Sequence, residues 1–172
     1  MAKISLLGGV AGVGKTTLFH ALMERYGDNG VLYFDPGEIY RRDFYLNKLK
    51  TIPEIEDSIA DEMISSMSRN FSIISHWHYA VHRPGGYIPQ ISFERIKKVA
   101  ESEVIDMALL VLVEAPADII LARRLKDARI KTRPLSLEII NEEIAREREF
   151  LEKELTIFTK VLGVDRVQKI VI

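Results

Sequence analysis

The chain contains no cysteine among its 172 residues, so it is not one of the small secreted folds that disulfides hold together. Long apolar runs are missing as well, since runs such as Met107 to Val113 are far too short to cross a bilayer. The amino terminus passes almost at once into glycine-rich sequence, and we expect no signal peptide. These absences predict a soluble cytoplasmic protein without a membrane partner.

Excess charge of one sign is also lacking. The 24 basic and 25 acidic residues leave a net charge of −1, whereas nonspecific binding to nucleic acid normally requires a basic surface. Apolar residues make up 47% of the chain and charged residues 28%, a composition that excludes a disordered protein. The length predicts a single domain over residues 1–172.

Short apolar runs alternate with longer amphipathic segments along the chain. The runs predict strands over residues 3–7, 31–34, 71–75, 107–113 and 164–172. The amphipathic segments predict helices over residues 15–26, 38–70 in two pieces broken near Pro53, 92–103, 116–126 and 136–162. Residues 76–91 are expected to form a long irregular loop. Alternation of strand and helix predicts a three-layer α/β/α fold with a mostly parallel five-stranded sheet, and ligands bind such sheets beyond the carboxyl ends of their strands.

One motif lies between the first predicted strand and the first predicted helix. Residues 9–16 read Gly-Val-Ala-Gly-Val-Gly-Lys-Thr and match G-x-x-x-x-G-K-[ST] without a mismatch. Glycines allow the backbone N–H groups to form a concave nest for an anion, and the helix points its positive end at the same place. Lys15 supplies a cation for the β- and γ-phosphates, and Thr16 a hydroxyl for Mg²⁺. The predicted ATP-binding residues are Gly9, Gly12, Val13, Gly14, Lys15, Thr16 and Thr17.

A second feature is the strongly basic stretch over residues 121–133. Arginine forks match phosphate oxygens, and an arginine-bearing segment can close over a nucleotide and exclude water. A solvated helix end is the alternative interpretation, because basic residues suit the negative end of a helix dipole. Together with the phosphate loop, the stretch predicts a short lid over residues 127–135.

These features resemble the adenylate kinases and related nucleoside monophosphate kinases, the archaeal type most of all. The resemblance is carried by residues 9–17, by His78 with the segment Pro84 to Pro89, and by residues 112–116, 120–125 and 127–134. It implies a P-loop NTPase fold and phosphoryl transfer from Mg²⁺-bound ATP to a nucleoside monophosphate, foremost from ATP to AMP to give two ADP. It also implies an acceptor-binding insertion over residues 37–70.

Site residues follow from the same resemblance. The implied catalytic residues are Lys15, Arg124, Arg129 and Arg133, with Arg123 as a further candidate. The implied acceptor-binding residues are Gly37, Arg41, Arg42, His78 and Tyr87. The candidate metal ligands are Thr16 and Asp35. In one departure, His76 stands where the family has an acid that helps to hold Mg²⁺, and neutral imidazole is a poor ligand for this hard cation. Asp35 and Glu114 are the acids available to replace it.

Three alternatives stay open at this point. A kinase of the shikimate or gluconate type would use Asp35 to orient a substrate hydroxyl. A nucleotide-binding regulator with weak ATPase activity would offer the long helix 136–162 as a partner or homo-oligomer surface through Ile140, Ile144 and Leu151, although such a face more commonly packs on the sheet. A zinc site at His76, His78 and His82 has suitable spacing, but no cysteine or clear carboxylate completes it.

Overall fold

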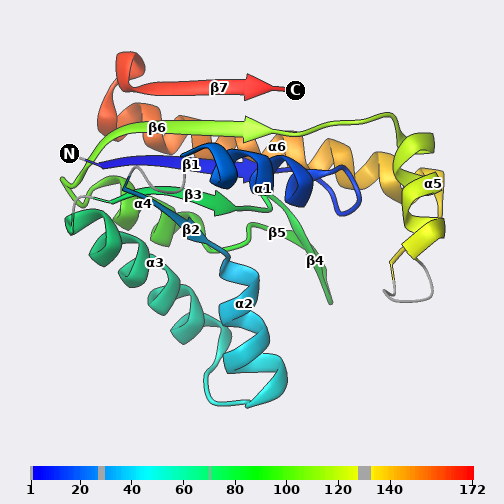
Figure 1. Cartoon of the computed structure of the whole chain (residues 1–172). Coiled ribbons are helices and arrows are strands. Elements are labelled where there is room, and N and C mark those ends of the chain that lie inside the picture. The colour runs from blue at the N-terminus through cyan, green and yellow to red at the C-terminus, as the bar shows by residue number, and fades with distance from the viewer. Residues whose placement is uncertain (1, 27–29, 70, 128–132) are drawn as a thin grey trace.

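The central sheet has five parallel strands in the order β2-β3-β1-β6-β7. The computed structural model describes residues 2–26, 30–69, 71–127 and 133–172. The strands are β1 (Ala2–Gly8), β2 (Val31–Phe34), β3 (Ser72–His76), β6 (Ile105–Leu112) and β7 (Val167–Val171). The predicted parallel five-stranded sheet is thus confirmed. Because β1 lies in the middle, the loop that follows it lies at the centre of the carboxyl edge (Figure 1).

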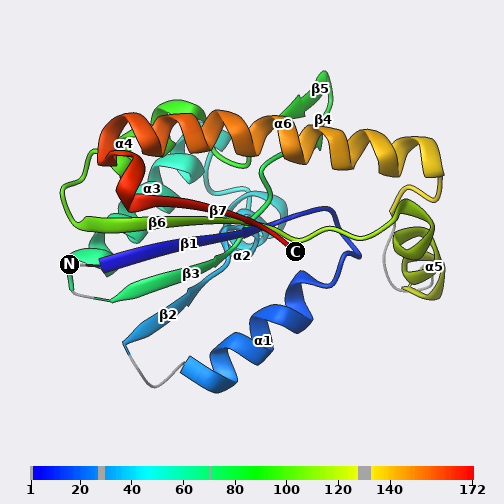
Figure 2. The same cartoon turned by 90° about the horizontal axis from the view of Figure 1, so that it is seen from above.

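Helices cover both faces of this sheet, which confirms the predicted three-layer fold (Figure 2). Helix α1 (Lys15–Tyr26) lies on one face, and α3 (Ile52–Ser68), α4 (Phe93–Ala100) and α6 (Leu137–Leu162) lie on the other. Helix α5 (Ala117–Asp127) lies beyond the carboxyl edge and packs against α6. None of the described helices is long and apolar enough to cross a membrane.

Alternation along β1 divides its side chains between the two apolar layers. Ile4 and Leu6 belong to the main core beneath α3, α4 and α6, whereas Leu7 packs with Phe19 of α1. Successive strand residues point to opposite faces, so a strand covered on both sides is apolar nearly throughout. On α6, Ile140 and Leu151 are buried in the cores. These two residues therefore pack inside the chain and are not available to a partner.

The segment after β2 is helical in two pieces, as predicted. Helix α2 (Pro36–Tyr40) continues into a π-helical turn over Arg41–Leu46, and α3 begins after Thr51. A capping box begins α3, in which the Thr51 amide donates to the Glu54 carboxylate at 2.7 Å. Pro53 cannot lie inside a continuous helix, because it has no backbone N–H to donate. It fits the first turn of α3, where that N–H would have no partner in the helix, so a new helix starts there.

The prediction of an irregular loop over residues 76–91 is wrong in part. Strands β4 (Val81–Arg83) and β5 (Gly86–Ile88) form an antiparallel hairpin that projects from the body (Figure 1). The turn is tight because Gly85 and Gly86 adopt φ angles of +103° and +123°, which other residues rarely accept. Strands of three residues are too short to show an alternating pattern, so the sequence did not predict them.

Helix α6 carries a fully buried acid. Glu154 has no exposed surface, and its carboxyl accepts a hydrogen bond from the Trp77 indole nitrogen at 3.1 Å. Burial raises the pKa of Glu154 well above its ordinary value, and this effect outweighs the opposing Trp77 bond. Burial therefore favours the protonated form of this carboxyl in the folded protein.

We expect the substitution Glu154→Gln to stabilise the fold by an amount that grows with pH. In the unfolded chain Glu154 ionises near its usual pKa of about 4.3, whereas the folded protein resists this ionisation. A raised pKa in the folded state means that stability is lost as pH rises above the unfolded value, and glutamine removes that loss. Urea unfolding of both proteins between about pH 4 and about pH 8 measures the difference. Parallel stability curves for the two proteins would contradict the raised pKa.

Candidate active site

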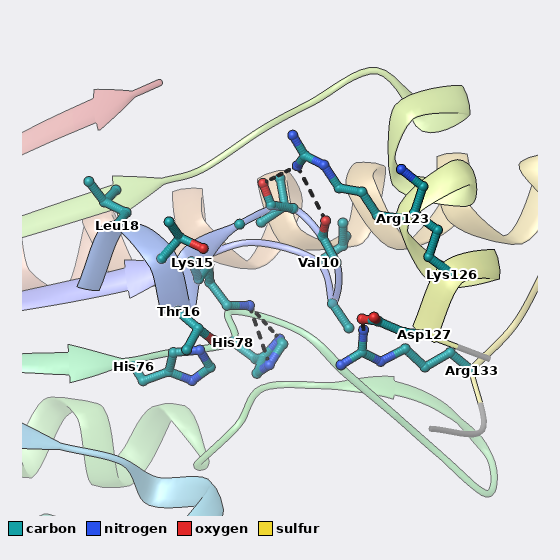
Figure 3. A pocket seen from close by; sticks show the side chains of 15 residues that line it. Val10, Lys15, Thr16, Leu18, His76, His78, Arg123, Lys126, Asp127 and Arg133 are labelled. Carbon is teal, nitrogen blue, oxygen red and sulfur yellow. Dashed lines mark hydrogen bonds and ion pairs between the residues drawn. The ribbon is translucent and has the colours of Figure 1, made fainter. Parts of the chain in front are cut away.

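A pocket of about 810 Å³ opens beside the phosphate loop (Figure 3). It is lined by residues from the loop and α1, from the end of β3, from α5 and from the chain that enters α6. These residues are Val10 to Leu18, His76, His78, Arg123, Lys126, Asp127 and Arg133. The site therefore lies where the parallel-sheet rule places ligands, beyond the carboxyl ends of β1 and β3.

The phosphate loop supplies most of this lining. The predicted ATP-binding residues Gly12 to Thr17 all line the pocket, whereas Gly9 lies at the base of the loop. Gly9 has a φ of +134°, and a Cβ there would lie 2.4 Å from the Val113 carbonyl oxygen. Only glycine fits this position, so the loop can leave β1 at this angle because residue 9 has no side chain.

Lys15 lies in the wall of the pocket and is 4% exposed. Its ammonium donates to the Gly9 carbonyl and lies 3.2 Å and 3.3 Å from the two ring nitrogens of His78 (Figure 3). Burial lowers the pKa of Lys15 to about 8, against the opposing charge of Glu147. Lys15 is therefore still mostly protonated at neutral pH, and a cation lines the site.

His78 lies in a network that includes two residues the sequence did not single out. Its Nδ1 lies 3.1 Å from Glu147 Oε1, and its backbone amide donates to Gln90 at 2.6 Å. Burial and the charge of Lys15 lower the pKa of His78, whereas Glu147 raises it. The predicted acceptor-binding residue His78 thus contacts the phosphate-loop lysine. A charged residue on the inward face of a predicted helix was the available signal for Glu147.

The arginines of the basic stretch fall into two groups. Arg123 lines the pocket and donates to the Val13 carbonyl at 2.7 Å. Arg133 also lines it, 3.7 Å from Asp127. Arg124 does not line the pocket, and Arg129 lies outside the described residues. Among the described residues, Arg123 and Arg133 are therefore the arginines that line the pocket, and the sequence ranked the first of them behind Arg124.

Arg124 is 1% exposed and binds three groups inside the protein. It donates to the carbonyls of Ala11 at 2.9 Å and Pro134 at 3.1 Å, and it pairs with the Glu143 carboxylate. These contacts join the phosphate loop to the start of α6. With its donors directed to these groups, Arg124 holds the loop in place in this structure.

His76 lies at the end of β3 and lines the pocket. Burial and the Lys15 charge lower the pKa of His76 to about 4, so its imidazole is neutral. Its ring lies 5.9 Å from that of His78, while His82 is on the hairpin and packs against Tyr87. Within the described ranges, no three His, Cys, Asp or Glu side chains are grouped to hold a metal ion.

The remaining acceptor candidates, and the metal candidate Asp35, do not line the main pocket. Asp35 accepts a hydrogen bond from the Gly37 amide at 2.8 Å and caps α2, and Arg42 pairs with Asp43 at 2.5 Å. Arg41 is exposed on the same segment. Tyr87 lines a smaller pocket of about 180 Å³ that also includes His78 and Glu147. The structure thus places these candidates around the site without bringing them together.

The chain is similar in sequence to archaeal adenylate kinases. It is 29% identical to the adenylate kinase of Methanocaldococcus jannaschii, over 85% of this chain and 80% of that protein. It is 25% identical to the adenylate kinase of Pyrococcus horikoshii, over 75% of this chain and 68% of that protein. Adenylate kinases of two further archaea match at 27% and 28% identity. No family model matches the chain.

Solved structures share the fold at lower identity. A sugar kinase from Janibacter superposes with a TM-score of 0.51 at 14% identity, covering 95% of this chain and 97% of that one. A chain of the Pnkp1/Rnl/Hen1 RNA repair complex superposes with a TM-score of 0.55 at 16% identity over 88% of this chain, which spans only 46% of that longer chain. The phosphate loop, the parallel sheet and the archaeal relatives confirm the resemblance found in the sequence and support an adenylate kinase-like P-loop kinase that acts as a nucleotide phosphotransferase.

Proposed function

We propose that the protein transfers the γ-phosphoryl group of Mg²⁺-bound ATP to a nucleoside monophosphate, foremost AMP, to give two nucleoside diphosphates. The observation that carries this proposal is the buried ammonium of Lys15 at the phosphate loop, which follows the central strand of the sheet. The similarity to archaeal adenylate kinases supports AMP as the acceptor.

The pocket supplies the two things that phosphoryl transfer needs, which are positioning and positive charge. The loop amides and Lys15 would hold the donor phosphates, and Arg123 and Arg133 bring two more cations to the same pocket. An oxygen of the acceptor phosphate attacks the γ-phosphorus, and the bond to the bridging oxygen breaks to release ADP. The attacking oxygen is already ionised, so no general base is required.

The oxygen donors of the pocket fit a magnesium ion that arrives with ATP. Mg²⁺ keeps several waters and takes one or two protein oxygens besides those of the phosphates. The Thr16 hydroxyl is exposed in the pocket and would be such a ligand. Asp35, the second candidate, already uses one carboxylate oxygen to cap α2. Bound there, Mg²⁺ would neutralise charge on the phosphates, while the neutral His76 ring would stay outside its coordination sphere.

The contacts of Asp35 favour a phosphate acceptor over a hydroxyl acceptor. A kinase of the shikimate or gluconate type would need this carboxylate to take a proton, yet here it caps α2 through Gly37. Burial, together with this carboxylate, raises the pKa of the neighbouring Tyr33 hydroxyl. We therefore expect Asp35→Asn, which still caps a helix, to keep kcat within about threefold for a nucleoside monophosphate. A loss of about 10²-fold or more would instead assign Asp35 the role of a base for a hydroxyl substrate.

The proposed function is tested by measuring ADP formation from Mg²⁺-ATP with AMP, CMP, GMP and UMP as separate acceptors. Shikimate and gluconate serve as hydroxyl acceptors in parallel, and reactions without an acceptor measure ATP hydrolysis. We expect transfer to one or more monophosphates well above hydrolysis. Tight ATP binding in a calorimeter with no transfer to any acceptor would contradict the proposal and favour a nucleotide-binding regulator.

A further inference from the structure

Glu147 is a buried charge that the proposed reaction does not itself use. It is 2% exposed, and it lies on the inward face of α6. Both of its carboxylate oxygens have a partner on the segment after β3: Oε2 accepts from the Tyr79 amide at 2.8 Å, and Oε1 lies 3.1 Å from His78 Nδ1. A buried carboxylate with both oxygens paired is held in one position.

The anchor for this carboxylate is itself fixed. The Tyr79 hydroxyl donates to the Leu6 carbonyl at 2.9 Å and lies 3.2 Å from the Val111 carbonyl, so Tyr79 is tied to both β1 and β6. A Cβ at Gly8 would lie 2.2 Å from the Tyr79 ring, which shows how closely the ring packs on β1. Glu147 is therefore held relative to the strand from which the phosphate loop departs.

The hydrogen-bond partners of His78 determine which ring nitrogen carries its proton. An ionised carboxylate only accepts and an ammonium only donates. Because Nδ1 lies beside the Glu147 carboxylate, Nδ1 is therefore the protonated nitrogen. The Lys15 ammonium lies 3.2 Å from Nδ1 and 3.3 Å from Nε2, and the ring lone pair that remains for it is on Nε2. In the opposite tautomer a lone pair on Nδ1 would face the Glu147 carboxylate oxygen, which itself offers only lone pairs.

We propose that Glu147 is a positioning residue for the phosphate-loop lysine: it fixes the orientation and tautomer of the His78 ring, and that ring in turn holds the Lys15 ammonium in the pocket. The inference rests on the proposed function, in which Lys15 binds the phosphates of ATP. An ammonium already held beside the phosphate site needs less reorganisation when charge develops in the transition state.

We call the contacts from Glu147 through His78 to Lys15 the relay. The substitution Glu147→Gln tests this relay with little change in side-chain shape. Glutamine has one acceptor oxygen for two donors, the Tyr79 amide and the His78 Nδ1–H, so it cannot satisfy both. Glu154→Gln is the matched control, because Glu154 is equally buried on the same helix but binds Trp77 and does not contact His78 or Lys15. We expect E147Q to lower kcat/KM for ATP by about 10- to 100-fold, and E154Q to leave it unchanged.

A spectroscopic readout separates positioning from a general effect on the fold. Nitrogen-15 spectra of the imidazole rings, assigned for His78 with a His78→Asn variant, report the tautomer directly. We expect one Nδ1-protonated tautomer in the wild type and in E154Q, and loss of that single tautomer in E147Q. An unchanged His78 spectrum in E147Q would overturn the proposal, and so would a changed spectrum with unchanged kcat/KM.

His78→Asn keeps the relay testable where E147Q does not fold. This variant cuts the relay at the ring while leaving the bond between Glu147 and the Tyr79 amide, and we expect a similar fall in kcat/KM. In the double variant the two losses should not add, because both remove one relay; additive losses would overturn the proposal. Failure of the proposed function is distinguishable, since the wild type would then transfer no phosphate while the His78 spectrum would still report the relay.

Discussion

Replacing Lys15 by methionine is expected to lower kcat/KM for ATP by roughly 10³-fold or more. Methionine keeps an unbranched side chain in a site where Lys15 is 4% exposed, so the substitution removes mainly the charge. The lost ammonium is the one cation fixed within the loop that would contact the transferred phosphoryl group. A coupled assay with ATP as the varied substrate measures the effect.

Lys126→Met is the matched control for this loss. Lys126 also lines the pocket but is exposed on α5, and we expect it to change kcat/KM by less than about tenfold because solvent screens its charge. The melting temperature of K15M should stay equal to that of the wild type or rise, since burial disfavours the ammonium and lowers the pKa of Lys15 to about 8. Activity of K15M close to that of the wild type would refute the assignment of the phosphate loop.

Replacing Arg124 by alanine is expected to destabilise the fold by about 3–5 kcal/mol. The guanidinium is 1% exposed, and its removal leaves the Glu143 carboxylate and the carbonyls of Ala11 and Pro134 without a donor. The Glu143 side chain is only 18% exposed, so water replaces the lost hydrogen bond incompletely. Chemical unfolding monitored by circular dichroism gives the free energy of unfolding.

The neighbouring Arg123→Ala is the control, because it changes the same residue type one position away. Arg123 is exposed and faces the pocket, so we expect stability near that of the wild type and a higher KM for ATP. The sequence assigned the catalytic role to Arg124. That assignment would stand if R124A were as stable as R123A and lost activity alone.

Local features of the fold followed from the sequence. Helix α1 begins at Lys15 and ends at Tyr26, and β2 spans Val31–Phe34, both at the predicted bounds. Helix α6 spans Leu137–Leu162, close to the predicted range 136–162. Each of these depends on residues within a few positions of one another, and the chemistry that determines them is readable along the chain.

The site could be predicted only as far as its local motif extends. The loop over residues 9–16 can be recognised from the sequence, because its glycines, lysine and threonine lie within eight residues and act on one phosphate chain. The roles proposed for Gly37, Arg41, Arg42 and Tyr87 stay predictions, as does a lid over residues 127–135, of which the structure describes 127 and 133–135.

The sequence by itself therefore determined the phosphate loop, the parallel sheet and the resemblance to adenylate kinase-like P-loop kinases. The tertiary structure alone decided which arginine faces the pocket and which acid supports the lysine. Arg123 and Arg124 are adjacent in the chain, and only the packing of α5 against the loop sends one outward and the other inward. Glu147 lies 69 positions from His78. No local sequence pattern predicts this contact, because it depends on the face of the sheet on which α6 packs.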